Sequence, residues 1–182
     1  QISMCSGQAR DIAFESARSV DLAAYLEMIE GKTAALFRAT AQMGAIAAGA
    51  DQMRARAYGE LARLYGIAFQ IQDDLLGIWG TPEITGKPSG ADLRKRKWTY
   101  PVVWGIASGA CEVADAYHRG DALDDLAVEA ARAALERAGA QAAAEEALDR
   151  YLERAETVAR EGRLDTAGSV RAFLAQGARR SA

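Results

Sequence analysis

The longest uninterrupted helical pattern in this sequence is residues 51–79, DQMRARAYGELARLYGIAFQIQDDLLGIW. Apolar residues surround most of the helix that this stretch predicts, which is typical of a helix buried in a protein core. At about 100° per residue, Gln70, Asp73, Asp74 and Gly77 fall on one narrow face. The stretch therefore predicts a core helix whose polar side carries two adjacent carboxylates.

The composition of the rest of the chain also favours helices. Alanine makes up 41 of the 182 residues, and all three prolines fall within residues 82–101. Alanine is the strongest helix former and is depleted in strands, whereas proline breaks a helix interior. The sequence therefore predicts an all-α fold and excludes a β-sandwich or an alternating α/β sheet.

The expected helix boundaries follow from apolar periodicity and from capping residues. A loop is expected over residues 80–97, where glycine and proline are concentrated. Ser19 is the expected N-cap of a helix over residues 21–49, kinked at Gly31, and Asp165 is the expected N-cap of the last helix. The other helices are expected over residues 8–17, 100–108, 112–117, 124–138, 141–161 and 166–177.

Charge, hydropathy and cysteine usage exclude several classes of function. The net charge is −3, and residues 94–97 form the only basic run, which is typical of a solvated loop and not of a nucleic-acid-binding surface. The longest uncharged stretches have 12 and 14 residues, fewer than the roughly 20 that span a bilayer. Cys5 and Cys111 fit free thiols of a reducing compartment, with a disulfide as the alternative. We therefore expect a soluble, cytoplasmic protein without a transmembrane segment and without a nucleic-acid partner.

The sequence begins with Gln1 inside a helical pattern, without a capping signal or a signal-peptide charge pattern. We expect the chain to be part of a longer protein. A mature N-terminus made by processing is the alternative.

Asp73 and Asp74 are the first candidates for chemistry. Two adjacent carboxylates on a core helix remain ionised only if a cation, a basic side chain or water compensates their charge. Mg²⁺ prefers oxygen ligands and binds one or two carboxylates together with substrate phosphates. The alternative is an aspartate pair at a hydrated helix end, close to Gly80.

Lysines around this helix indicate an anionic ligand. Lys87 lies among glycines and proline, Lys97 follows Asp92, and Lys32 lies at the predicted kink. Carboxylates and lysines next to an apolar interior suit a diphosphate attached to a hydrocarbon tail. For Lys32 the alternative is a surface lysine whose aliphatic stem covers apolar neighbours.

Four segments resemble the trans-isoprenyl (polyprenyl) diphosphate synthase family, in the order and at the spacing of that family. YGIAFQIQDDLLG, residues 65–77, resembles its second aspartate-rich motif, and GKPSGADL with KWTYPVV, residues 86–103, resembles the segment that follows. YLEMIEGKTAALF, residues 25–37, resembles its lysine-threonine segment, and GQARD, residues 7–11, resembles its glutamine-aspartate helix. The resemblance runs from about Gln8 to Ile106.

The resemblance implies an isoprenoid-synthase-type helical bundle around a central cavity, of which this chain would be a part. It implies a transferase that condenses an allylic diphosphate with isopentenyl diphosphate to make a longer polyprenyl diphosphate of the geranyl, farnesyl or geranylgeranyl type. In that family Mg²⁺ assists the loss of diphosphate, a carbocation forms, and the proton lost after condensation passes to the released diphosphate. It also implies a cytoplasmic homodimer.

The resemblance also implies a role for each matching residue. Asp73 and Asp74 would bind Mg²⁺, and Thr33 and Gln70 would lie beside the reacting carbons. The remaining implied site residues are the diphosphate-binding Lys32, Lys87 and Lys97, and the supporting Gln8, Asp11 and Asp92.

Two features depart from the family pattern. Gly77 stands where an aspartate is usual. The first aspartate-rich motif has no counterpart in this sequence. The other aspartate pair is expected to be a helix cap, Asp124, and a surface residue, Asp125. We therefore expect residues 1–182 to be the C-terminal portion of one polyprenyl synthase domain, inactive on its own because the N-terminal portion is missing. The alternatives are a class I terpene cyclase, a non-catalytic subunit that binds a prenyl diphosphate, and an alanine-rich structural bundle.

Overall fold

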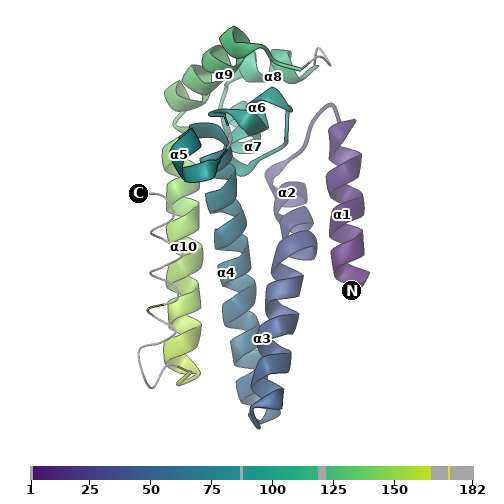
Figure 1. Cartoon of the computed structure of the whole chain (residues 1–182), viewed down its shortest axis with the longest axis vertical. Coiled ribbons are helices and arrows are strands. Elements are labelled where there is room, and N and C mark those ends of the chain that lie inside the picture. Colours follow the sequence, from purple (N-terminus) through teal and green to yellow (C-terminus); the bar gives the residue numbers. More distant parts are fainter. Residues whose placement is uncertain (1, 87, 119–121, 165–171, 173–182) are drawn as a thin grey trace.

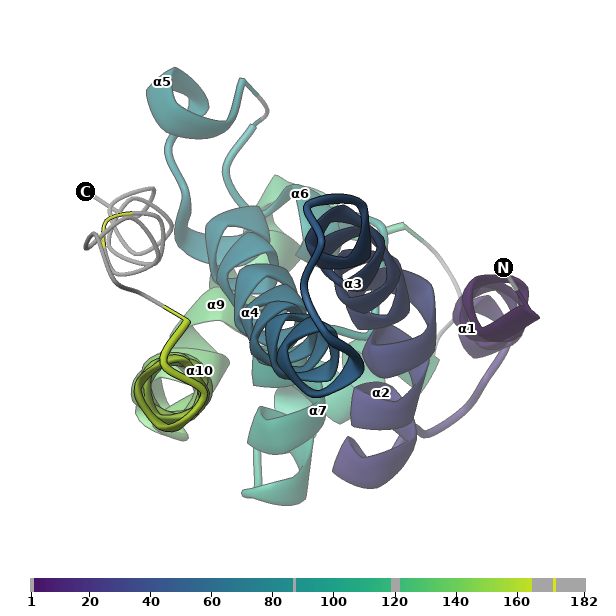
Figure 2. The same ribbon diagram turned by 90° about the horizontal axis from the view of Figure 1, so that it is seen from below.

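The computed structural model describes residues 2–86, 88–118, 122–164 and 172. Over these residues the chain forms helices joined by loops, without a strand, which confirms the all-α prediction. Three long helices run side by side, with α4 between the other two (Figures 1 and 2). They are α3 (Ala35–Ala47), α4 (Gln52–Trp79) and α10 (Ala140–Glu161).

The remaining helices extend this row and close one end of it. Helix α1 (Ile2–Glu15) packs beside α2 (Leu22–Ile29), on the side of the row away from α10 (Figure 2). Five further helices gather at the end where α4 finishes (Figure 1). They are α5 (Pro82–Thr85), α6 (Ala91–Arg94), α7 (Tyr100–Ala107), α8 (Cys111–His118) and α9 (Asp125–Arg137).

The predicted kink is a turn of π-helix, Glu30–Ala34, which joins α2 to α3 without a break in the helical run. Helix α1 crosses this turn, called η1, at very close range. A Cβ added to Gly7 would lie 2.1 Å from the backbone nitrogen of Lys32, and one added to Gly31 would lie 2.9 Å from the carbonyl oxygen of Ser3. Two glycines therefore let the backbones touch where the chain leaves α-helical geometry, and Lys32 and Thr33 lie at that point.

Capping explains two of the helix starts. Asp21 caps α2, since its extended backbone lets Oδ1 accept from Ala24 N at 2.7 Å. Asp51 caps α4 in the same way. The prediction of Ser19 as the cap of this segment was wrong, because Asp21 directly precedes the first helical residue and reaches its free N–H groups.

The loop predicted over residues 80–97 contains two short helices, α5 and α6, so that prediction was wrong in part. Pro82 fits the first turn of α5 because that position needs no N–H donor. Lys87 lies outside the described residues, as do Asp165 and, except for residue 172, the helix predicted over residues 166–177.

Helix α4 is a core helix, as predicted. Near its C-terminal end, Ile71 packs in one large cluster with Val102 of α7 and Leu135 of α9, all fully buried. Close to the middle of α4, Leu64 packs against Ala155 of α10 in a second cluster. Truncating a side chain such as Leu64 to alanine would cost about 2–5 kcal/mol.

Helix α3 packs on α4 with one side only and has no fully buried residue. Its other side exposes Leu36, Met43 and Ile46, each by more than half of the side-chain surface. The described part of the chain therefore leaves an apolar face on α3 open. None of the described helices combines the length and hydropathy needed to cross a bilayer, and Cys5 and Cys111 are free, exposed thiols, as favoured from the sequence.

Candidate functional site

Asp74 is the centre of a polar network at the C-terminal end of α4. Its carboxylate is 1% exposed. Oδ2 accepts hydrogen bonds from the Tyr25 hydroxyl and, at 2.8 Å, from the Tyr100 backbone N–H. Oδ1 accepts from Gln70 Nε2 at 3.2 Å, and Lys97 Nζ lies 3.6 Å away from it. Four partners from α2, α4, α7 and the loop after α6 therefore surround one buried carboxylate.

Burial and these partners act on the Asp74 pKa in opposite directions. Burial raises the pKa to about 6, although the charge of Lys97 and the donated hydrogen bonds favour the ionised form. The pKa of Tyr25 is raised well above its ordinary value, first by burial and then by the Asp74 carboxylate, so Tyr25 remains a donor.

The Tyr25 and Tyr100 donors were missed in the sequence. Tyr25 was considered only as part of the segment over residues 25–37 and was given no role, although a buried tyrosine usually needs a hydroxyl partner, which was the available signal. Tyr100 contributes its backbone because it is the first residue of α7, which Thr99 caps, and the first N–H groups of a helix have no partner within it. Such a contact depends on the fold and has no signal in local sequence.

Asp73 has a different environment from Asp74. Its side chain is exposed, and Gln70 Nε2 lies 3.5 Å from its Oδ2. The sequence analysis placed both carboxylates on one polar face and did not distinguish their burial. Adjacent helix positions differ in direction by about 100°, so the packing around α4 buries Asp74 and leaves Asp73 exposed. One carboxylate is enclosed and the other is open to ligands.

Gln70 connects this network to η1. Thr33 Oγ1 donates to Gln70 Oε1 at 3.0 Å, so the amide must point its Nε2 toward Asp73 and Asp74. The fold thus brings two predicted site residues, Thr33 and Gln70, into direct contact beside both aspartates.

Lys97 lies between two carboxylates. Its Nζ is 3.2 Å from Asp92 Oδ2 as well as 3.6 Å from Asp74 Oδ1. Burial lowers the Lys97 pKa, but the nearby charges of Asp74, Asp92 and Asp73 raise it by more. The Lys97 pKa therefore lies above its ordinary value. The basic run at 94–97 is therefore not a uniformly solvated loop, since Arg96 also donates to the backbone of Tyr117 at 3.0 Å.

Lys32 forms an ion pair with Asp11, which joins η1 to α1. Both side chains keep some exposure, 31% and 22%. Gln8 lies exposed one turn before Asp11, and within the described residues its side chain has no hydrogen bond. Lys32 and Lys97 are thus both neutralised by aspartates, so an anionic ligand would have to replace these aspartates as their partner.

The model of the polyprenyl synthetase family matches residues 1–136 of this chain. The chain belongs to the polyprenyl synthetase family. Its relatives include the (2E,6E)-farnesyl diphosphate synthase of Mycobacterium tuberculosis, 56% identical over 103 residues that cover 57% of this chain and 29% of the relative. The geranylgeranyl diphosphate synthase of the same organism is 39% identical over 157 residues, 85% of this chain and 45% of the relative.

Solved structures of the family confirm the predicted partial helical fold. The geranylgeranyl pyrophosphate synthase of Corynebacterium glutamicum, in a structure with isoprenyl diphosphate and magnesium, has a TM-score of 0.86 at 27% identity, over 98% of this chain and 51% of that chain. The polyprenyl synthetase of Streptomyces coelicolor has a TM-score of 0.85 at 32% identity, over 94% of this chain and 53% of that chain. The chain therefore spans about half the length of these structures, and less than half of the two relatives above.

The family implies a divalent metal, and the open carboxylate fits one. The Asp74 oxygens already accept three hydrogen bonds and form an ion pair with Lys97, whereas Asp73 faces outward with oxygens available. Among the described residues, no three histidine, cysteine, aspartate or glutamate side chains form a group that could hold a metal. Asp73 is therefore the described side chain of this network that could hold a divalent cation that prefers oxygen ligands.

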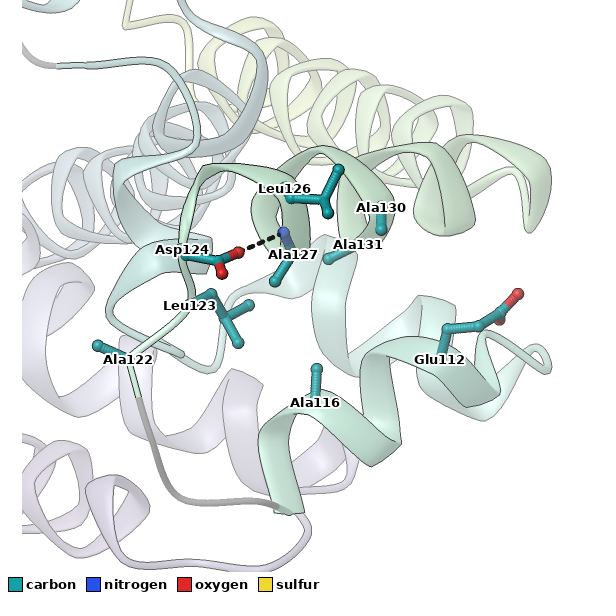
Figure 3. Close-up of a pocket in the computed structure, with 9 residues that line it drawn as sticks. All are labelled: Glu112, Ala116, Ala122, Leu123, Asp124, Leu126, Ala127, Ala130 and Ala131. Atoms are coloured by element: carbon teal, nitrogen blue, oxygen red, sulfur yellow. Dashed lines mark hydrogen bonds between the residues drawn. The ribbon is translucent and has the colours of Figure 1, made fainter.

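The second aspartate pair of the chain lies elsewhere. Figure 3 shows a pocket between α8 and α9, lined mainly by alanine and leucine, where Asp124 accepts from Ala127 N at 2.8 Å and so caps α9. Asp125 is 93% exposed and pairs with Arg94 at 2.7 Å. The prediction of a cap and a surface residue is confirmed.

Proposed function

We propose that the protein is a Mg²⁺-dependent trans-prenyltransferase that condenses an allylic diphosphate with isopentenyl diphosphate to make a longer polyprenyl diphosphate. The observation that carries this proposal is the convergence of Asp73, Asp74, Gln70, Thr33 and Lys97 at one end of a core helix. Membership of the polyprenyl synthetase family supports it, as do relatives named farnesyl and geranylgeranyl diphosphate synthases. The product would be of the geranyl, farnesyl or geranylgeranyl type.

Asp73 and Asp74 would have different roles at the metal site. Asp73 would hold Mg²⁺, which supplies positive charge that offsets the diphosphate as it leaves. Asp74 would be a positioning residue, because its contacts hold Gln70 and Lys97 in place on either side of it. Asp74 would thus fix the direction of the groups that meet the substrate.

The lysines would bind the diphosphate by changing partners. Lys32 would turn from Asp11, and Lys97 from Asp92, toward phosphate oxygens, which are equally good acceptors for an ammonium group. Lys87, which follows α5 in the sequence, would be the third lysine of this set. Thr33 and Gln70 would present oxygen dipoles to the carbocation, and the proton lost after condensation would pass to the released diphosphate.

The rest of the domain would complete the site. We propose that residues 1–182 are the C-terminal portion of one domain, and that an N-terminal portion carries the first aspartate-rich motif and the isopentenyl diphosphate site. The open apolar face of α3 and the relatives' greater length support this. The 182-residue chain alone should therefore not elongate a substrate. The whole protein would be a cytoplasmic homodimer.

The test is turnover by the full-length gene product with Mg²⁺, geranyl diphosphate and labelled isopentenyl diphosphate. We expect label in a prenyl diphosphate longer by one isoprene unit, and a loss of about 100-fold in kcat/KM for Lys32→Ala. Loss of geranyl diphosphate without consumption of isopentenyl diphosphate would instead indicate a terpene cyclase. Binding of geranyl diphosphate without turnover would indicate a non-catalytic subunit.

A further inference from the structure

A residue from another part of the chain fills the space beside Gly77. Gly77 lies one turn after Asp74 on α4, and a Cβ added to it would lie 2.3 Å from Asp92 Oδ2 and 2.6 Å from Asp92 Cγ. Real side chains do not approach this closely. The carboxylate of Asp92 therefore occupies the space that any side chain at position 77 would need.

Asp92 is held in this place by Lys97. The ammonium lies 3.2 Å from Asp92 Oδ2, and the Lys97 backbone N–H donates to the Asp92 carbonyl oxygen at 2.9 Å. Asp92 itself is 18% exposed, so its carboxylate is largely shielded from water. Since Lys97 Nζ also lies 3.6 Å from Asp74, the ammonium is fixed between one carboxylate on α4 and one carried by α6.

We propose that Asp92 replaces the side chain missing at Gly77 and is the positioning residue that holds the Lys97 ammonium beside Asp74, and that Gly77 is required to admit it. The proposal rests on the proposed function, in which Lys97 binds the substrate diphosphate. Lys97 is then oriented before substrate arrives and needs only to exchange one acceptor for another.

One consequence concerns the aspartate that is usual at this position of the family motif. Gly77→Asp should harm this protein, because the new side chain would meet Asp92 and place a second negative charge against it. Removing Asp92 as well should relieve both problems, since one carboxylate would again face Lys97. Gly77→Asp and Asp92→Ala should therefore compensate each other.

The first measurement is thermal unfolding of the full-length gene product carrying each substitution and both. Gly77→Asp should lower Tm by about 5 °C more than Gly44→Asp, a matched change on α3 where an added Cβ meets no atom within 4 Å. The double variant should melt within about 2 °C of Asp92→Ala. If the double variant shows the sum of the two single losses, Asp92 does not occupy the place of a residue-77 side chain.

The second measurement separates positioning from stability. In the full-length gene product, each single substitution should raise KM for the allylic diphosphate about tenfold with a smaller change in kcat, and the double variant should return within about threefold of the parent. Multiplied KM losses in the double variant would overturn the proposal. If the parent protein does not turn over at all, the proposed function fails, whereas the melting cycle still decides where Asp92 lies.

Discussion

Replacing Tyr25 with phenylalanine removes a hydroxyl that donates to the buried carboxylate of Asp74. A hydrogen bond to a charged group contributes about 1.5–3 kcal/mol, and the cost of its loss is higher when the charge stays buried. We therefore expect Tyr25→Phe to lower the free energy of unfolding by about 2 kcal/mol at pH 7.5. Tyr117→Phe is the matched control, because Tyr117 is also buried but donates to a neutral carbonyl, that of Lys97, and its loss should cost about 1 kcal/mol.

The two variants should also differ in their response to pH. The Asp74 pKa is raised to about 6, so the carboxyl is charged at pH 7.5 and mostly protonated at pH 5. The Tyr25 hydroxyl forms a weaker hydrogen bond to a neutral carboxyl than to a carboxylate. The loss of stability in Tyr25→Phe should therefore fall toward about 1 kcal/mol at pH 5, whereas the loss in Tyr117→Phe should stay constant.

The assay is urea unfolding of the full-length gene product, followed by circular dichroism at both pH values without divalent metal. Equal costs for the two tyrosines at pH 7.5 would refute the charged hydrogen bond. A cost for Tyr25→Phe that does not change with pH would refute the assignment of the raised pKa to Asp74.

Two further changes test the close crossing and the buried carboxylate. Gly7→Ala places a Cβ 2.1 Å from the Lys32 backbone nitrogen and should lower the free energy of unfolding in urea by about 3 kcal/mol. The control is Gly44→Ala, whose Cβ enters open space and should raise the free energy of unfolding by up to about 1 kcal/mol. Similar effects of the two substitutions would contradict the close crossing of α1 and η1. Folding raises the Asp74 pKa from 3.8 to about 6, so the folded state binds the carboxyl proton of Asp74 more tightly than the unfolded state does. This tighter binding stabilises the fold at low pH. The stabilisation is lost as pH rises from about 4 to above 6, by on the order of 3 kcal/mol. Asp74→Asn should remove that decline when unfolding is measured from pH 4 to 7.5, and an unchanged decline would assign it to another group.

Much of the fold is predictable because it depends on local pattern. Apolar periodicity predicted the long helices and most of their ends to within a few residues. Asp124 was correctly predicted as a cap, whereas Asp51, the cap of α4, was predicted as the first residue of that helix. The short helices α5 and α6 were not predicted, because glycine and proline end long helices but are compatible with a single helical turn. Between these two helices, Gly86 and Gly90 adopt the left-handed backbone conformation.

The site was predictable in membership and less so in geometry. Helical spacing places Asp73 and Asp74 on one face but does not say that one is buried and the other open, since that depends on where α2 and α7 pack. Tyr25 joins the site across 49 positions of sequence, and Asp92 reaches Gly77 only after the chain has turned back. Such contacts follow from tertiary packing, which residue spacing alone does not encode.

The role of Asp73 in holding Mg²⁺ is tested most directly by Asp73→Ala in the full-length gene product, with isopentenyl diphosphate consumption followed across a Mg²⁺ titration. We expect kcat/KM to fall about 100-fold, whereas Asp125→Ala, an aspartate of the exposed pair with Arg94, should leave it unchanged. Consumption by Asp73→Ala at the parent rate and with the parent's Mg²⁺ dependence would contradict the site.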